Sequence, residues 1–146
     1  MKKLKLIPVL ALVFMLNVAS MCSNDDNSNP STPTPISTII TSGAWRVTLY
    51  NENGSIHTSD FTGYNFTMNA NGALTAVKDS ATKTGTWSTF VDSGATKFAI
   101  AFPDTDGPFE SITDDWLVLT SAASKIELKH VSGGDGSIDL LTFEKN

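Results

Sequence analysis

The feature that most limits the possible folds is a repeated unit, a short strand followed by a tight turn, which begins near residue 44. In the first unit, Trp45, Val47 and Leu49 alternate with more polar residues, and alternation with a period of two is typical of a strand with one buried face. The turn that follows contains Asn53-Gly54, a pair that tolerates the positive φ angles of hairpin turns. The pattern predicts antiparallel neighbouring strands joined by short turns.

Eight such strands are expected, and their spacing of roughly 8 to 16 residues favours an all-β barrel or sandwich. They cover residues 44–50, 61–68, 73–78, 83–90, 96–102, 115–121, 125–131 and 137–145. Residues 36–40 fit either a helical turn or a short apolar plug, and the irregular segment 103–113 contains an expected helical turn near residues 109–112. We predict an eight-stranded antiparallel up-and-down barrel, with a β-sandwich as the alternative.

The N-terminus has the charge pattern of an export signal. Three lysines among the first five residues precede an apolar run over residues 6–18. A basic start followed by a short apolar run is typical of a secretory signal, and the run is shorter than the about 20 residues that a membrane-spanning helix needs. We therefore predict a signal peptide over residues 1–21.

Cys22 is the only cysteine of the chain and follows directly after this leader. Its position resembles that of the cysteine in bacterial lipoprotein signals, which implies that Cys22 becomes the acylated first residue of the mature protein and anchors it to a membrane. Ala19 and Ser20 suit the positions before such a cysteine, whereas Met21 departs from the usual small residue. The alternatives are cleavage after Ser20, which would leave a free thiol, and retention of the leader as an anchor.

Residues 23–37 consist almost entirely of Ser, Thr, Asn, Asp and Pro, a composition that cannot form a core and is typical of an extended tether. The first four of them, Ser-Asn-Asp-Asp, look like the export signals of Bacteroidetes lipoproteins. This resemblance implies an outer-membrane location and leaves open the outward face of that membrane. The expected organisation is a signal peptide (1–21), a lipidated cysteine with a disordered tether (22–37) and a β domain (38–146).

The distribution of charge excludes one class of partner. All fifteen acidic residues follow the leader, whereas three of the ten basic residues lie inside it. A surface with such an excess of negative charge repels phosphate backbones. We therefore expect no nucleic-acid partner.

Gly43-Ala44-Trp45 resembles the glycine-any-tryptophan signature that opens lipocalins, in which the tryptophan plugs the closed end of the barrel. The segments 85–88 and 141–145 look like those of the small lipocalin-like domains found on Bacteroidetes lipoproteins. In lipocalins an arginine on the last strand packs over the tryptophan. Here the only arginine is Arg46, beside the tryptophan, and Lys145 is the nearest residue of the last strand that could replace it.

A closed barrel would point large apolar side chains into its interior. The tentative ligand-binding set consists of Tyr64, Phe66, Trp87, Phe98, Ile100, Trp116 and His130. An eight-stranded barrel either fills its interior with such side chains or holds one small ligand. The set therefore forms either a simple core or a pocket for a small apolar ligand, bordered by residues 103–113 because long loops often bind ligands.

Other groups of polar residues give only weak evidence for a metal site or a catalytic site. Asp104, Asp106 and Glu110 resemble part of a calcium loop, since Ca²⁺ prefers closely spaced oxygen ligands, but the full loop pattern is absent and the three remain a weak calcium candidate. His57 and His130 have no partner at zinc-ligand spacing, and no serine lies in a nucleophile-elbow motif. We expect no enzyme activity and no cofactor.

Two functions compete at this point. The first is a lipid-anchored module that binds a small apolar ligand inside the barrel. The second is a structural or interaction module of the cell envelope, with a filled core and an outer face, including Tyr50, Leu117 and Leu119, that contacts a protein or a glycan. A cavity above roughly 300 Å³ would favour the first function.

Overall fold

The structure, a computed structural model, describes residues 33–146, which form one compact unit. The expected signal peptide, Cys22 and the tether up to Thr32 lie outside the described residues. Among the residues that are described, none of the helices has the length and apolar character needed to cross a membrane.

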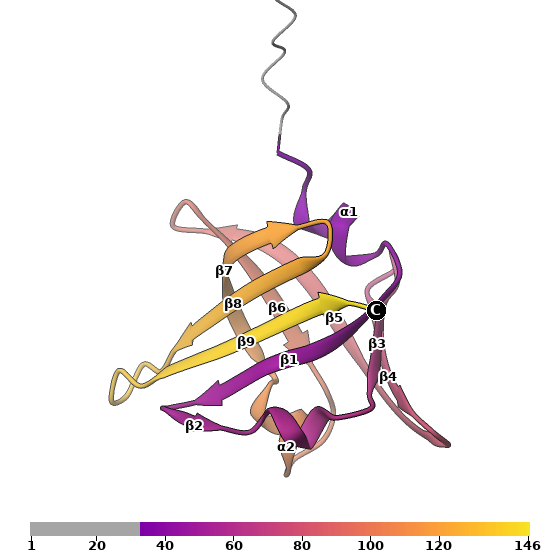
Figure 1. Ribbon diagram of the computed structural model, residues 1–146. Coiled ribbons are helices and arrows are strands. Elements are labelled where there is room, and N and C mark those ends of the chain that lie inside the picture. The colour runs from indigo at the N-terminus through magenta and orange to yellow at the C-terminus, as the bar shows by residue number, and fades with distance from the viewer. Residues whose placement is uncertain (1–32) are drawn as a thin grey trace, which may run out of the picture. The chain divides into compact units, whose positions relative to one another are not determined.

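The described chain forms an antiparallel β-barrel (Figure 1). The strands are β1 (Ala44–Glu52), β2 (Ser55–Ile56), β3 (Asn65–Met68), β4 (Ala73–Lys78), β5 (Ala81–Asp92), β6 (Ala95–Ala101), β7 (Asp114–Ala122), β8 (Lys125–Val131) and β9 (Ile138–Lys145), and the short helices are α1 (Ile36–Ile40), η1 (Thr58–Phe61) and α2 (Pro108–Ser111). Each strand from β3 to β8 pairs with the next along the chain, and β9 pairs with β1. The predicted eight-stranded up-and-down barrel is confirmed, with the short β2 as an additional strand, and the β-sandwich alternative is wrong.

The ladder between β1 and β9 closes the barrel. Trp45 lies opposite Lys145, Val47 opposite Phe143, and Tyr50 opposite Leu141. On its other side, β1 pairs with β3 only through Ala44 and Trp45 and with β2 only through its last two residues. The closure between β1 and β9 removes most of the free sheet edge that an open sheet would expose.

A β-bulge in β1 changes which side chains face the interior. The register against β9 shifts between Val47 and Leu49, and an extra residue in one strand reverses the faces of all later side chains. Tyr50 is therefore buried, with 1% of its surface exposed, while Leu49 is only half-buried. The sequence-based assignment of Leu49 to the inner face and Tyr50 to the outer face was wrong for this reason.

The segment expected as a strand from residue 61 begins instead with a helical turn. Phe61 ends η1 and is buried, and Gly63 follows with a φ of 85°, a left-handed conformation that interrupts an extended strand. Regular pairing begins only at Asn65. The helical turn expected near residues 109–112 is present as α2, and the one expected at residues 36–40 is present as α1.

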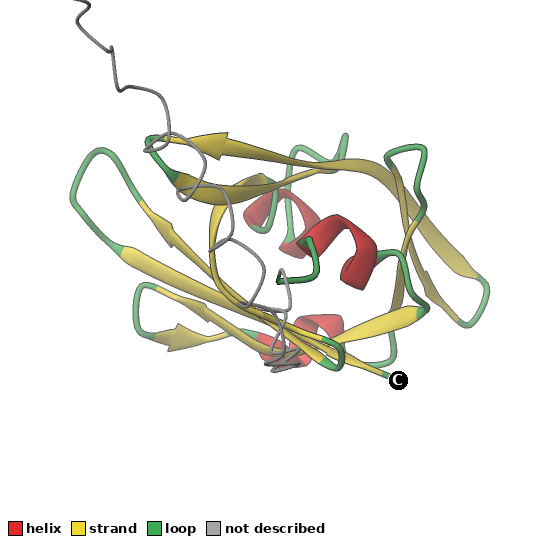
Figure 2. Cartoon of the chain, turned by 90° about the horizontal axis from the view of Figure 1, so that it is seen from above, coloured by secondary structure: helices red, strands yellow, loops and turns green. Residues whose placement is uncertain are grey.

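Helix α1 covers one end of the barrel, which we call the α1 end. Ile36, Ile39 and Ile40 are buried, and the indole N–H of Trp45 donates a hydrogen bond to the carbonyl oxygen of Ile40 at 2.8 Å. The packed part of the domain thus begins at Ile36, two residues before the expected start at residue 38. Seen from the α1 end, the strands surround the helical segments (Figure 2).

Lys145 occupies the place that the lipocalin resemblance gives to a late arginine. Its Nζ atom lies 5.9 Å from the centre of the Trp45 ring and donates a hydrogen bond to Ser42 Oγ at 3.1 Å. A cation over an aromatic face contributes about 0.5–1 kcal/mol at an exposed site. Trp45 is therefore held between α1 and the last strand.

The opposite end of the barrel is plugged by Phe109 of α2. Its ring contacts those of Phe61, Tyr64 and Phe102 edge to face, with centroids 5.7, 5.1 and 4.8 Å away. Aromatic pairs in this geometry stabilise a core by about 0.5–1.5 kcal/mol beyond the burial of their surface. The interior between Trp45 and Phe109 is a core of packed apolar side chains.

Gly85 marks a point where β5 passes very close to the end of β6. A Cβ atom at Gly85 would collide with the backbone carbonyl oxygen of Ala101 and meet the Phe102 ring at 2.9 Å. We expect Gly85→Ala to lower the free energy of unfolding by about 1–3 kcal/mol, the range for overpacking. Urea denaturation followed by tryptophan fluorescence would measure this change.

Gly134→Ala is the matched control for this prediction, since nothing lies within 4 Å of a Cβ atom at Gly134. The free energy of unfolding of this variant should stay within about 0.5 kcal/mol of the wild-type value. Equal stability of the two variants would contradict the close approach of β5 and β6.

Candidate functional site: a polar pocket at the open end

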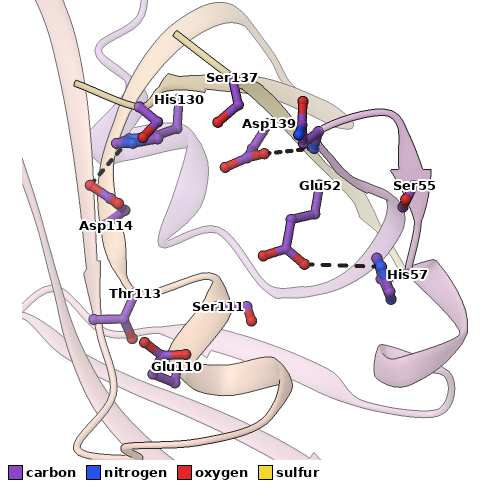
Figure 3. Close-up of a pocket in the computed structure, with 12 residues that line it drawn as sticks. Glu52, Ser55, His57, Glu110, Ser111, Thr113, Asp114, His130, Ser137 and Asp139 are labelled. Carbon is purple, nitrogen blue, oxygen red and sulfur yellow. Dashed lines mark hydrogen bonds and ion pairs between the residues drawn. The ribbon is translucent and has the colours of Figure 1, made fainter. Parts of the chain in front are cut away.

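A pocket of about 600 Å³ lies at the end of the barrel opposite α1, and we call it the mouth pocket (Figure 3). It is lined by Glu52, Asn53, Ser55, His57, Glu110, Ser111, Thr113, Asp114, His130, Ser132, Ser137 and Asp139. None of these side chains is aliphatic beyond the methyl group of a threonine. The pocket therefore offers a polar surface to any ligand.

The up-and-down topology explains why these residues meet. Glu52 ends β1, Asp114 begins β7, His130 lies one residue before the end of β8 and Asp139 is the second residue of β9. Successive strands of such a barrel run in opposite directions, so the ends of β1 and β8 lie beside the starts of β7 and β9. Glu110 is added by α2, which crosses this end of the barrel.

Two pairs of histidine and carboxylate stand on opposite walls of the mouth pocket (Figure 3). His130 Nδ1 lies 3.2 Å from Asp114 Oδ1 on one wall. On the other wall, His57 Nε2 lies 4.0 Å from Glu52 Oε2, and His57 Nδ1 lies 3.6 Å from Asp60 Oδ2. Each wall therefore places a histidine within ion-pair distance of a carboxylate.

Tyr50 lies buried beside the mouth pocket, where the bulge in β1 places it. Its hydroxyl donates a hydrogen bond to the carbonyl oxygen of Ser111 at 3.1 Å. Burial, reinforced by the nearby carboxylates of Glu52 and Asp139, raises the pKa of the Tyr50 phenol far above its usual value, and the hydrogen bond to Ser111 opposes this only in part. A phenol with a raised pKa stays neutral and keeps its proton.

The lining of the mouth pocket carries an excess of negative charge. Four carboxylates, those of Glu52, Glu110, Asp114 and Asp139, face two histidines, and neither lysine nor arginine belongs to the lining. Asp139 also accepts a hydrogen bond from the backbone N–H of Asn53 at 2.8 Å, which holds its carboxylate in place. Such a pocket attracts cations and hydrogen-bond donors and repels anions.

The residues predicted to bind a ligand lie in the hydrophobic core or pack against it, with one exception. Phe66, Phe98, Ile100 and Trp116 are buried, Trp87 is nearly so, and Tyr64 packs partly buried against them. Only His130 lines the mouth pocket.

The two large indoles of this set also have structural partners. Trp87 Nε1 donates to the carbonyl oxygen of Asn69 at 2.9 Å, and Trp116 Nε1 donates to that of Ile112 at 3.0 Å. The packing of these tryptophans is thus fixed by their hydrogen bonds as well as by their neighbours.

The weak calcium candidate is divided between two places. Asp104 forms an ion pair with Lys83, whereas Glu110 lines the mouth pocket and Asp106 is exposed. Within residues 33–146, no group of three or more His, Cys, Asp or Glu side chains is placed to hold a metal ion.

Most of the mouth pocket was missed by sequence reasoning. Glu52 lies next to a sequence that reads as a turn, Asp114 reads as a residue that solubilises a strand, and Asp139 lies in the polar start of the last strand. Each is explained locally by turn chemistry or exposure. The signal that could have found them is their position, since all three lie at strand ends that an up-and-down barrel brings to one side.

No known family model matches this chain, and no curated protein is significantly similar to it in sequence. One similar solved structure is the crystal structure of a DUF4847 family protein from Bacteroides vulgatus ATCC 8482, with a TM-score of 0.52 and 16% sequence identity over 77% of this chain and 98% of that protein. At this identity the likeness concerns the fold alone. A small β-barrel domain of this kind therefore occurs in a Bacteroides protein.

Replacing Tyr50 with Phe should change how the stability of the protein depends on pH. The phenol of the unfolded chain loses its proton above about pH 10, while the buried phenol keeps it because its pKa is raised. The folded state then binds more protons than the unfolded state, so stability falls as pH rises through this window. Tyr50→Phe removes this contribution.

The measurement is urea denaturation of wild-type and Tyr50→Phe protein at about pH 9 and about pH 11. At the lower pH the wild type should be more stable by about 1 kcal/mol, the usual contribution of a hydrogen bond. This advantage should shrink by about 1.4 kcal/mol at the higher pH, because one pH unit above the unfolded pKa corresponds to that free energy. An equal difference in the free energy of unfolding at the two pH values would show that the Tyr50 phenol is not buried near carboxylates.

Proposed function

We propose that this protein is a non-catalytic binding module, anchored in the cell envelope by lipid at Cys22, that holds a small polar ligand with positive charge in the mouth pocket. The charge of the pocket lining supports a positively charged ligand, because the lining contains four carboxylates and neither lysine nor arginine. The pocket volume of about 600 Å³ falls within the range of small-molecule sites, roughly 300–1,000 Å³.

A ligand in the mouth pocket is better supported than an apolar ligand inside the barrel. Phe66 lies 5.3 Å from Phe143 and Phe109 lies 4.8 Å from Phe102 between ring centroids, so the rings fill the space that a ligand would need. An interior ligand would have to displace these contacts, and large side chains in a packed core move only at a cost in stability. The mouth pocket needs no such rearrangement.

The carboxylates of the mouth pocket suit an ammonium ligand. A unit positive charge at about 4 Å from a carboxylate gains about 1 kcal/mol in water and about 4 kcal/mol in partly buried surroundings. Asp139 is held in place by the N–H of Asn53, and Ser137 and Thr113 add hydroxyl groups to the lining. A linear diamine or an amino sugar combines the charge and the hydrogen-bond donors that this lining can accept.

The ligand class can be tested by calorimetric titration with putrescine, spermidine and glucosamine at low ionic strength. At least one of them should bind, and added salt should weaken the binding because it screens partly exposed charges. The double variant Glu52→Gln with Asp139→Asn should bind at least about tenfold more weakly, since the loss of two attractive charges exceeds about 1.4 kcal/mol.

Asp79→Asn is the matched control for the double variant. Asp79 lies in the turn between β4 and β5 at the same end of the barrel but does not line the mouth pocket. Its loss should leave the affinity almost unchanged. Equal weakening by the control would mean that the net charge of the protein attracts the amine, and uptake of fatty acids in place of amines would favour the barrel interior.

The lipid anchor is tested by growing cells with an alkyne-bearing fatty acid and detecting the label on the purified protein. Wild-type protein should carry the label and Cys22→Ser should not. Met21→Gly should increase the labelled fraction, because a small residue before the cysteine fits lipoprotein processing better. An unlabelled wild-type product with a reactive Cys22 thiol would show cleavage after Ser20 and ordinary secretion.

A further inference from the structure

We propose that the α1 end of the barrel lies against the headgroup surface of the bilayer that carries the anchor, so that the mouth pocket points away from the membrane. This inference rests on the proposed lipidation of Cys22. Three features of residues 33–146 lead to it: the distribution of charge between the two ends, the apolar surface around α1, and the end at which the described chain begins.

Negative charge is concentrated at the mouth end. Of the thirteen acidic residues in the described chain, only Asp92, Glu127 and Glu144 lie on the half of the barrel near α1. Glu127 is paired with Lys125 at 2.6 Å and Glu144 with Arg46 at 3.7 Å. The α1 end is thus almost neutral, whereas the mouth end would be repelled by the phosphates of an anionic bilayer.

The α1 end also exposes apolar side chains around two shallow grooves. Val91 is 71% exposed and Leu119 is 52% exposed. Thr96 lies opposite Val91 in the ladder between β5 and β6, and Thr96 and Leu119 line the same groove. Val91 and Leu119 therefore lie near each other. The second groove is lined in part by Ile39 and Ala122. Apolar side chains on a nearly neutral surface favour contact with the boundary between headgroups and acyl chains.

Exposed apolar side chains occur at the mouth end as well, including Ile56 at 63% and Val77 at 38% exposure, but this end carries most of the acidic residues. Val131 and Ile138 are 51% and 45% exposed and lie opposite each other where β8 ends and β9 begins. Asp139 and Asp135 are close to them in the chain. Inserting this hairpin into a headgroup layer would bring carboxylates towards phosphates, which opposes docking.

The described chain begins at the α1 end. Pro33 lines both grooves and lies three residues before the start of α1. Ten residues lie between Cys22 and Pro33, so the two are at most about 40 Å apart even when the chain is fully extended. A tether of this length holds the domain near the bilayer at a high effective concentration, so a weak contact suffices to orient it.

The orientation can be measured on the full lipidated protein in vesicles of phosphatidylethanolamine with a minority of phosphatidylglycerol. Val91→Cys and Val131→Cys each provide an exposed thiol for a fluorescent maleimide, and acylation blocks the thiol of Cys22. Lipids with a nitroxide in the headgroup should quench the dye at residue 91 several-fold more than the dye at residue 131. Adding Leu119→Glu should remove most of this difference, whereas adding Ile138→Glu should not.

Equal quenching at the two positions in anchored protein would overturn the orientation and leave the anchor intact. A dye at residue 91 that is shielded from aqueous iodide but not quenched by the nitroxide lipid would mean that a protein surface covers the α1 end, which also overturns the inference. A wild-type chain that stays in the aqueous phase with a reactive Cys22 would overturn the anchor and this inference together.

Discussion

The pairing of β1 with β9 is the constraint on which the rest of the structure depends. It joins the first and last strands of the barrel, so its contacts have a large sequence separation and cost more loop-closure entropy than those of a hairpin. At one end it sets Lys145 over Trp45. At the other end it brings the turn after β1 against β9, where Asn53 donates its N–H to Asp139. One ladder therefore builds both the closed end and part of the mouth pocket.

The side chains that fill the two ends of the barrel determine where a ligand can bind. Trp45 and α1 fill one end of the barrel, and Phe109 of α2 fills the other with aromatic contacts in several directions. Space remains beyond Phe109, where the strand ends carry polar and acidic side chains. Removing water from carboxylates is costly unless another group pairs with them, so a ligand in this space would need groups that pair with these carboxylates.

The barrel could be predicted because its determinants are local. Alternation identifies each strand, and Asn53-Gly54 identifies the first hairpin. The bulge near Thr48 could not be predicted, because its residues read as continuous alternation and the register shift appears only against β9. The assignment of Tyr50 to the outer face failed on this one displaced residue.

The mouth pocket required information that no segment of the chain contains. Glu52, Asp114, His130 and Asp139 lie on four different strands, and the three carboxylates each read locally as exposed polar residues. The up-and-down order alone places these strand ends together, so the carboxylates could have been grouped once the barrel was assumed. The proximity of these carboxylates to a buried phenol could not have been predicted, because Tyr50 reaches its place beside the pocket only through the bulge in β1. The strand order thus brings the carboxylates of the pocket together, and the one-residue irregularity in β1 adds a buried phenol beside them.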